Sequence, residues 1–302
     1  MSELTHHEVQ VNGIRMHYVQ AGTGDTLVLL LHGFPEFWFS WRSQLAALSP
    51  YFTVVAPDLR GYNDTDKPDW GYTVDVLSSD VAELIRALGF TQAVVVGHDW
   101  GGGVAWHLAI TAPELVQRLV VLNMPHPARF IQGTLTNPLQ LARSSYIGFF
   151  QLPFVAELVI GANNFALLDQ MFLNAAYNKA AFSPEVLQTY RTALAKPGAL
   201  TAALNWYRQL GSSLPMVATQ DAAALRVAVP AMLIWGEQDP ILSRELSYGT
   251  ERYAPQLRTH YIRESGHWVQ QEQPELVNRY LLDFLRDLSH ETHEPSQQPS
   301  TG

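Results

Sequence analysis

The chemistry of this sequence centres on Asp99, within the stretch Gly97-His98-Asp99-Trp100-Gly101. A run of valines precedes this stretch, and a helical pattern follows it directly. Glycines at 97 and 101 allow a strand-to-helix turn that is too tight for side chains. Such a turn lifts one residue above a parallel sheet, at a helix N-terminus where backbone N–H groups favour negative charge. An ionised carboxylate in that position can attack a carbon atom without first losing a proton.

Two further residues follow Asp99 in an order that suits catalysis. Asp239 stands in Gly236-Glu237-Gln238-Asp239-Pro240 and His267 in Gly266-His267-Trp268, each just after a predicted strand. Nucleophile, acid and histidine is the chain order typical of proteins with a nucleophile elbow. Taken singly, Asp99 also suits a helix cap, Asp239 an Asp-Pro turn and His267 a buried structural histidine. Taken together at strand ends, they predict a triad on one rim of the sheet.

The stretch His32-Gly33-Phe34-Pro35 ends another predicted strand and adds a fourth element. We expect the backbone N–H groups of Phe34 and Trp100 to form an oxyanion hole. Pro35 is a candidate for a cis peptide bond, because strand-end turns beside active sites are usual places for a cis-proline. An ordinary tight turn is the alternative.

Alternating strands and helices must position these residues. Continuous apolar runs indicate strands buried on both faces, and amphipathic patterns with short connections separate them. The sequence therefore predicts an α/β fold with a mostly parallel, doubly wound sheet, in which ligands bind beyond the carboxyl ends of the strands. The predicted strands lie within residues 8–20 (two, around Asn12-Gly13) and at 26–31, 53–56, 92–96, 118–122, 231–235 and 259–262. The predicted helices lie at 38–48, 73–88, 101–111, after Pro240, and at 274–288.

The pattern changes at about Pro125. Helical stretches rich in Ala, Leu and aromatic residues then replace the alternation, at 139–150, 155–160, 165–171, 184–194 and 199–210. We expect a helical cap at residues 125–225, inserted between a first core part at 1–124 and a second at 226–288. The polar stretch 289–302 is expected to be a disordered tail.

Composition limits the possible partners. The 302 residues carry a net charge of -9, which argues against nucleic acid or an anionic membrane as a partner. No cysteine is present, so disulfides, a thiolate nucleophile and Cys-ligated metals are excluded. The polar start lacks the apolar segment of a secretory signal, and apolar runs such as Leu27–Leu31 are too short for membrane insertion. We expect a cytoplasmic protein, either a monomer or a weak homodimer.

These motifs resemble those of the epoxide hydrolases of the α/β-hydrolase superfamily. The resemblance covers about residues 10–285 and implies the α/β-hydrolase fold with an inserted helical cap. It also implies the opening of an epoxide by water, with no metal or organic cofactor. The matching stretches are His32–Glu36 with Trp41-Arg42, Asp58–Tyr62, Gly97–Gly102 and Gly266–Trp268.

The resemblance further implies two cap tyrosines that hydrogen-bond the epoxide oxygen. Tyr207, in Asn205-Trp206-Tyr207-Arg208, matches one position closely, and Tyr146 matches the other in a looser motif. A packed aromatic residue of the cap is the alternative for each. The assignment suits the chemistry, because an opening epoxide develops an alkoxide to which a phenol can donate a hydrogen bond and then a proton.

The expected reaction has two steps. Asp99 attacks an epoxide carbon and forms a covalent alkyl ester, and His267, oriented by Asp239, then activates a water molecule that releases a vicinal diol. His98 is expected to brace the elbow, and Asp58 and Arg60 to form a pair that braces a loop. The cap, rich in Phe, Leu and Ala, favours a small apolar or aromatic epoxide.

Other functions use the same nucleophile or the same fold. A haloalkane dehalogenase commonly holds the halide with an Asn where this chain has Phe34, and a haloacid (fluoroacetate) dehalogenase carries Arg where this chain has Trp100. An esterase is disfavoured because carboxylate attack on an ester gives a labile anhydride. A non-catalytic receptor for small molecules is the alternative from another class.

Overall fold

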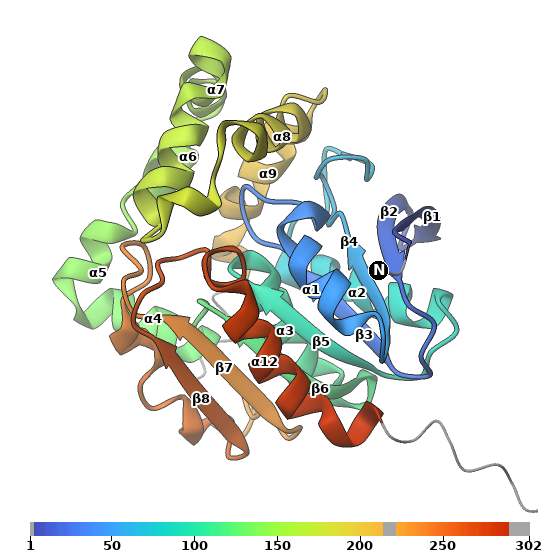
Figure 1. The fold of residues 1–302 in the computed structure, drawn as a ribbon. Helices are drawn as coiled ribbons and strands as arrows, with labels where there is room; N and C mark the ends of the chain where they lie inside the picture. The colour runs from blue at the N-terminus through green and yellow to red at the C-terminus, as the bar shows by residue number, and fades with distance from the viewer. Residues whose placement is uncertain (1–2, 214–221, 290–302) are drawn as a thin grey trace, which may run out of the picture.

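The computed structural model describes residues 3–213 and 222–289. At its centre lies an eight-stranded sheet with the strand order β1-β2-β4-β3-β5-β6-β7-β8 (Figure 1). Strands β3 to β8 are parallel, while β2 is antiparallel to both β1 and β4 at one edge. The strands are β1 (Thr5–Val11), β2 (Ile14–Ala21), β3 (Leu27–Leu31), β4 (Thr53–Pro57), β5 (Ala93–His98), β6 (Val116–Leu122), β7 (Ala231–Gly236) and β8 (Leu257–Ile262).

Helices cover both faces of the sheet and explain why the central strand β3 is apolar and buried at every position. In β3, Val28 and Leu30 pack toward α1 (Arg42–Leu48) and α12 (Pro274–Leu285), which lie in front of the sheet in Figure 1. The alternate residues of β3 pack toward α2 (Val74–Ala87) and α3 (Trp100–Thr111) on the other face. Because successive side chains of a strand point to opposite faces, two covered faces require continuous apolar runs.

Between β6 and β7, the described residues form helices and their connections. Several of these helices lie above one end of the sheet (Figure 1), close to the carboxyl ends of the strands. The expected boundaries of the core (1–124 and 226–288) and of the helical cap (125–225) stay a prediction. The helices are α4 (Pro127–Thr136), α5 (Pro138–Arg143), α6 (Tyr146–Phe150), α7 (Val155–Ala175), α8 (Pro184–Leu194) and α9 (Ala199–Arg208).

Helix α7 is bent, as the two separate stretches at 155–160 and 165–171 predict. The helical backbone is interrupted from Ala162 to Phe165, where three consecutive residues take positive φ angles. Among the described residues no single helix is long and apolar enough to cross a bilayer. The segments 138–150 and 155–175 meet the requirements of length and composition only together, as a pair bent by 94°.

The predicted strands and most predicted helices are confirmed, but the helix expected after Pro240 is wrong. Short 3-10 turns take its place, because Gly249 adopts a left-handed conformation and hydroxyl groups compete for backbone carbonyls: Ser247 donates to Arg244 O and Thr250 to Ser247 O. The expected tail, 289–302, lies outside the described part except for Ser289, which is the last residue of a short 3-10 helix. The remaining short helices are η1 (Trp38–Trp41), η2 (Pro113–Leu115), η3 (Lys179–Ala181), η4 (Leu210–Ser213), η5 (Arg244–Ser247), η6 (Thr250–Arg252), α11 (Val269–Glu272) and η7 (Arg286–Ser289).

The expected pairing of Asp58 with Arg60 is also wrong. The Arg60 side chain is fully buried and binds Asp80 of α2 through two contacts, Nε to Oδ2 at 2.6 Å and Nη2 to Oδ1 at 2.7 Å. Asn12, in the turn between β1 and β2, donates to the same carboxylate at 2.8 Å. Asp58 lies 2.6 Å from His17 Nδ1 instead. Each residue braces its loop, but against a different element of the core.

Removal of one partner from the buried pair should therefore destabilise the fold. We expect Asp80→Ala to lower the free energy of unfolding by about 3–5 kcal/mol, because Arg60 keeps its charge without a partner. Urea denaturation measures the change. The control is Glu83→Ala, which breaks the exposed Arg86–Glu83 pair and should cost at most about 1 kcal/mol. Equal losses for both variants would contradict this prediction.

Candidate active site

Asp99 occupies the tip of the turn between β5 and α3. Its backbone has a φ of 48° and a ψ of −124°, and it is the residue that precedes the first turn of α3. The turn needs its glycines: a Cβ on Gly101 would lie 2.2 Å from Leu31 O, and one on Gly97 would lie 2.3 Å from Gly101 O. Asp99 is 7% exposed, so its carboxylate is buried but still borders open space.

The structure brings Asp99, His267 and Asp239 together, although 168 residues separate the first two. His267 Nε2 lies 3.6 Å from Asp99 Oδ2, and His267 Nδ1 lies 2.8 Å from Asp239 Oδ2. Asp239 follows β7 and His267 follows β8, both at the carboxyl edge of the sheet. A histidine between two carboxylates has one nitrogen oriented by the first and the other directed at the second.

The second oxygen of Asp99 is held by the turn after β3. The Phe34 N–H donates to Asp99 Oδ1 at 2.9 Å. The Phe34–Pro35 peptide bond is cis, as predicted. Gly33 lies so close that a Cβ on it would approach Asp99 Cβ to 2.4 Å. Trp100 is the first residue of α3. That its backbone N–H contributes to an oxyanion hole stays a prediction.

The two carboxylates set the protonation of His267. Burial alone would lower the pKa of the ring, but the charges and hydrogen bonds of Asp239 and Asp99 outweigh burial and raise the pKa to about 10. Burial would likewise raise the pKa of Asp99, and the hydrogen bond and charge of His267, with further help from His98 and the Phe34 N–H, lower it instead. At neutral pH the site therefore holds a carboxylate beside an imidazolium.

Asn123, which the sequence analysis did not single out, orients Asp239. Its Nδ2 donates to Asp239 Oδ2 at 2.7 Å, and its Oδ1 accepts the Gly236 N–H at 2.9 Å. The other oxygen of Asp239 accepts the backbone N–H groups of Ile241 and Leu242, at 2.7 and 3.0 Å. A signal was present, because Asn123 is a polar residue directly after a buried strand, with a φ of 42°.

Glu36 and His98 join the elbow to the loop that carries His267. His98 Nδ1 lies 2.8 Å from Glu36 Oε2, and His98 Nε2 lies 2.8 Å from the backbone oxygen of His267. The Glu36 carboxylate also accepts the Gly33 N–H and the side-chain amides of two glutamines, Gln270 and Gln271. His98 is thus a bracing residue, as predicted. The buried Glu36 was missed, although it stands inside an aromatic stretch where a charge needs an explanation.

Tyr146 and Tyr207 lie close together in the helical region. Tyr146 begins α6 and Tyr207 stands in the last turn of α9, with 5.8 Å between their ring centroids. The Tyr207 ring packs edge-on against Trp100 at 5.2 Å. Burial raises the pKa of both hydroxyl groups, and the Asp99 carboxylate raises it further. Both phenols therefore stay protonated and able to donate hydrogen bonds at neutral pH.

Two cavities meet at Asp99, Tyr146 and Tyr207. The first, here called the α3 lobe, has a volume of about 120 Å³ and runs along α3 beneath α4. The second, the α7 lobe, has a volume of about 310 Å³ and also contacts His267. Most of the lining is apolar: Val74, Met124, Phe130, Ile131 and Leu210 in the α3 lobe, and Phe150, Leu167, Met171, Ile241 and Trp268 in the α7 lobe.

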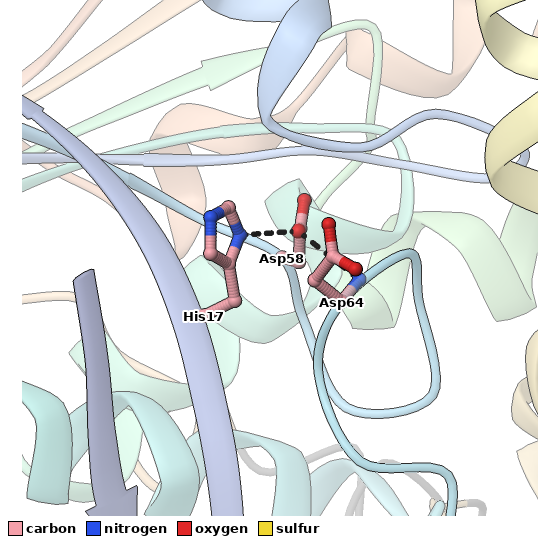
Figure 2. A group of neighbouring side chains, drawn as sticks. All are labelled: His17, Asp58 and Asp64. Atoms are coloured by element: carbon pink, nitrogen blue, oxygen red, sulfur yellow. Dashed lines mark hydrogen bonds and ion pairs between the residues drawn. The ribbon is translucent and has the colours of Figure 1, made fainter. Parts of the chain in front are cut away.

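A separate cluster has the residue types of a metal site. The ligand atoms of His17, Asp58 and Asp64 lie within 4.8 Å of one another, and Figure 2 shows the side chains directed toward each other. Other groups already occupy them, however. Asp58 accepts from the Trp38 N–H and lies beside His17, while the Lys196 ammonium lies 2.5 Å from Asp64 Oδ1. The cluster is a hydrogen-bond network that joins β2 to the loop after β4 and to the α8–α9 connection.

Known proteins share this architecture. The family described as alpha/beta hydrolase fold matches residues 26–274. Epoxide hydrolase 4 of Homo sapiens is 40% identical over 293 residues, which cover 94% of this chain and 79% of that protein. The AB hydrolase superfamily protein YfhM of Bacillus subtilis is 41% identical over 284 residues, covering 92% of this chain and 97% of that protein.

Solved structures agree with the sequence relatives. An epoxide hydrolase of Bacillus megaterium, in complex with an inhibitor, matches with a TM-score of 0.84 and 34% identity over 93% of this chain and 100% of that one. A variant of that enzyme was crystallised with its product, (R)-3-[1]naphthyloxy-propane-1,2-diol. Epoxide hydrolase A of Mycobacterium thermoresistibile matches with a TM-score of 0.82 and 30% identity, over 94% of this chain and 98% of that one. The chain therefore belongs to the α/β-hydrolase family and, within it, to the epoxide hydrolases.

Proposed function

We propose that this protein converts an epoxide into a vicinal diol through a covalent ester on Asp99. The observation that carries the proposal is the position of the Asp99 carboxylate. It is buried between the Phe34 N–H and His267, and it borders the same cavities as Tyr146 and Tyr207. The site thus has a nucleophile, a base and two acids around one apolar space. The diol bound by the Bacillus megaterium variant supports the product class.

In the first step, Asp99 Oδ2 attacks a ring carbon, and the bond between that carbon and the epoxide oxygen breaks. Asp99 Oδ1 is the less available oxygen, because it accepts the Phe34 N–H. The electron pair of the broken bond stays on the epoxide oxygen, which takes a proton from Tyr146 or Tyr207. Phenols that stay protonated at neutral pH are suited to donate to this developing alkoxide.

In the second step, water hydrolyses the ester. Esterification removes the negative charge of Asp99, so one of the two anions that raise the pKa of His267 disappears. His267 can then lose its proton, which restores the phenol that gave up its proton in the first step, and the neutral ring acts as a base on water. The activated water attacks Cγ of Asp99, and the oxyanion forms on Oδ1, where the Phe34 N–H already donates. Its collapse breaks the bond between Cγ and Oδ2, and the diol leaves with Oδ2 and the proton that His267 took from water. The new carboxylic acid of Asp99 then gives its proton to His267, which restores the carboxylate and the imidazolium. Because His267 borders the α7 lobe, we assign the water to that lobe.

The lining of the cavities favours a small apolar or aromatic epoxide, with water as the second substrate. Two phenols opposite the nucleophile suit an epoxide oxygen better than a halide, which needs donors without proton transfer. A dehalogenase that uses the same Asp nucleophile is therefore the second candidate function. The cytoplasmic location and the monomeric or weakly dimeric state stay proposals from composition.

An isotope experiment tests the covalent step. In a single turnover of styrene oxide with excess enzyme in ¹⁸O-labelled water, we expect an unlabelled diol and ¹⁸O in the Asp99 peptide. The reason is that the diol takes its new oxygen from Asp99, and water restores the carboxylate. Mass spectrometry of diol and peptide gives the answer. Label found directly in the diol would mean that water, not Asp99, attacks the epoxide.

A titration tests the charge cycle of His267. In the free protein we expect His267 to titrate near pH 10, followed by its ring signals in NMR. Asp99→Asn removes one of the two negative charges that raise the pKa of His267, so the midpoint should fall clearly. Asp64→Asn, on the surface, should leave the midpoint unchanged. Because the folded pKa lies above the unfolded value of about 6.5, this contribution to stability is complete below that pH and is lost as pH rises through about 10. A wild-type midpoint near 6.5 would refute the charge pair.

The tyrosines can be tested by removing one hydroxyl at a time. Tyr207→Phe should lower the rate of ester formation about a hundredfold, and the double variant with Tyr146→Phe should lower it further, because the alkoxide loses its proton donors. Rapid-quench kinetics with styrene oxide measures this step. Tyr62→Phe is the matched control: Tyr62 is buried, but its hydroxyl has no hydrogen-bond partner in the described ranges and it borders neither lobe. An equal loss in the control would exclude a specific role.

A further inference from the structure

The α3 lobe has a polar group at a position that the proposed reaction does not use. His107 borders this lobe and is 3% exposed. Its Nδ1 has no hydrogen-bond partner within residues 3–213 and 222–289. Its Nε2 lies 3.1 Å from Asp75 Oδ1 and pairs with that carboxylate. A buried polar group without a partner carries a free-energy cost that a ligand can remove.

The lobe follows one ridge of α3 from the nucleophile to His107. Asp99, Gly103 and His107 are spaced by four residues, so they lie along the same side of the helix. At 1.5 Å per residue, His107 lies about 12 Å along the helix axis from Asp99. Gly103 keeps the ridge low between them: a Cβ there would meet only Met124 Cε, at 3.2 Å. The space from the reacting carbon to His107 can therefore hold an extended chain.

The surroundings of His107 determine which chemical group it can bind. Burial lowers the pKa of its ring more strongly than the Asp75 carboxylate raises it, so the imidazole is neutral near pH 7. A neutral imidazole has one donor and one acceptor nitrogen. A hydroxyl group pairs with either nitrogen, because it both donates and accepts. A carboxylate is a poor match, since it would lie near the negative charge of Asp75.

We propose that the α3 lobe binds the tail of the substrate and that His107 hydrogen-bonds a hydroxyl group at the end of that tail. The substrate class is then a terminal epoxide with an apolar chain and an alcohol about 12 Å from the ring. His107 acts in this proposal as a specificity-determining residue, remote from the reacting atoms. The inference rests on the proposed epoxide hydrolysis and narrows its substrate.

Three epoxides of equal chain length test the proposal: 1,2-epoxydecane, 9,10-epoxydecan-1-ol and 9,10-epoxydecanoic acid. We expect the wild-type protein to have the highest kcat/KM for the alcohol. His107→Leu should lower the ratio of kcat/KM for the alcohol to that for 1,2-epoxydecane about tenfold, mainly through KM, because a buried hydroxyl loses its partner. His107→Gln should keep most of the ratio, since an amide also donates and accepts.

A second variant tests the path of the tail independently of His107. Gly103→Val places methyl groups on the ridge between Asp99 and His107. It should lower kcat/KM for 1,2-epoxydecane and for 9,10-epoxydecan-1-ol, relative to that for styrene oxide, about tenfold. Two results would overturn this inference and leave the proposed function standing. One is that His107→Leu does not change the ratio for the alcohol to 1,2-epoxydecane and Gly103→Val does not change the ratio to styrene oxide. The other is a wild-type preference for the acid. Failure of the wild-type protein to hydrolyse any of the four epoxides would overturn the proposed function itself.

Discussion

The buried carboxylate of Asp99 is the constraint around which the site is built. A charge removed from water is stable only when donors and an opposite charge surround it. Here the turn after β3 contributes the Phe34 N–H and the loop after β8 contributes His267, so distant segments must meet at the end of β5. A parallel sheet makes this meeting possible, because the carboxyl ends of all its strands lie at one edge.

A second buried anion, Glu36, holds these segments in their positions relative to one another. Its carboxylate contacts His98 beside the nucleophile and two glutamines of α11, which follow His267. Glu272 has a similar role on the other side of that loop: it accepts N–H groups from Gly266 and Trp268 and from Tyr177, directly after α7. The position of His267 therefore depends on contacts with both the sheet and the helical region. A shift of either would change the distance between base and nucleophile.

The two lobes beside Asp99 contact different chemical groups. The α7 lobe contacts His267, the proposed base, while the α3 lobe is lined by Gly103 and His107 of α3 and does not include His267. Tyr146 and Tyr207 stand where the lobes join, held by packing of the Tyr207 ring on Trp100 and of both rings on each other. The helical region thus contributes the two proposed acids, and the ends of the strands contribute the proposed nucleophile and base.

Local patterns in the chain were enough to predict the strands, the elbow at Asp99, the cis bond before Pro35 and the positions of Asp239 and His267 after strands, because each depends on neighbours within a few positions. The partner of Arg60 could not be predicted in this way, nor could the partners of Asn123 and Glu36 or the space along α3 between Asp99 and His107. Gln271, for example, donates to Glu36 across 235 positions of sequence. Contacts of this kind arise only when packing brings distant segments together, since no local pattern records which buried donor will face which buried acceptor.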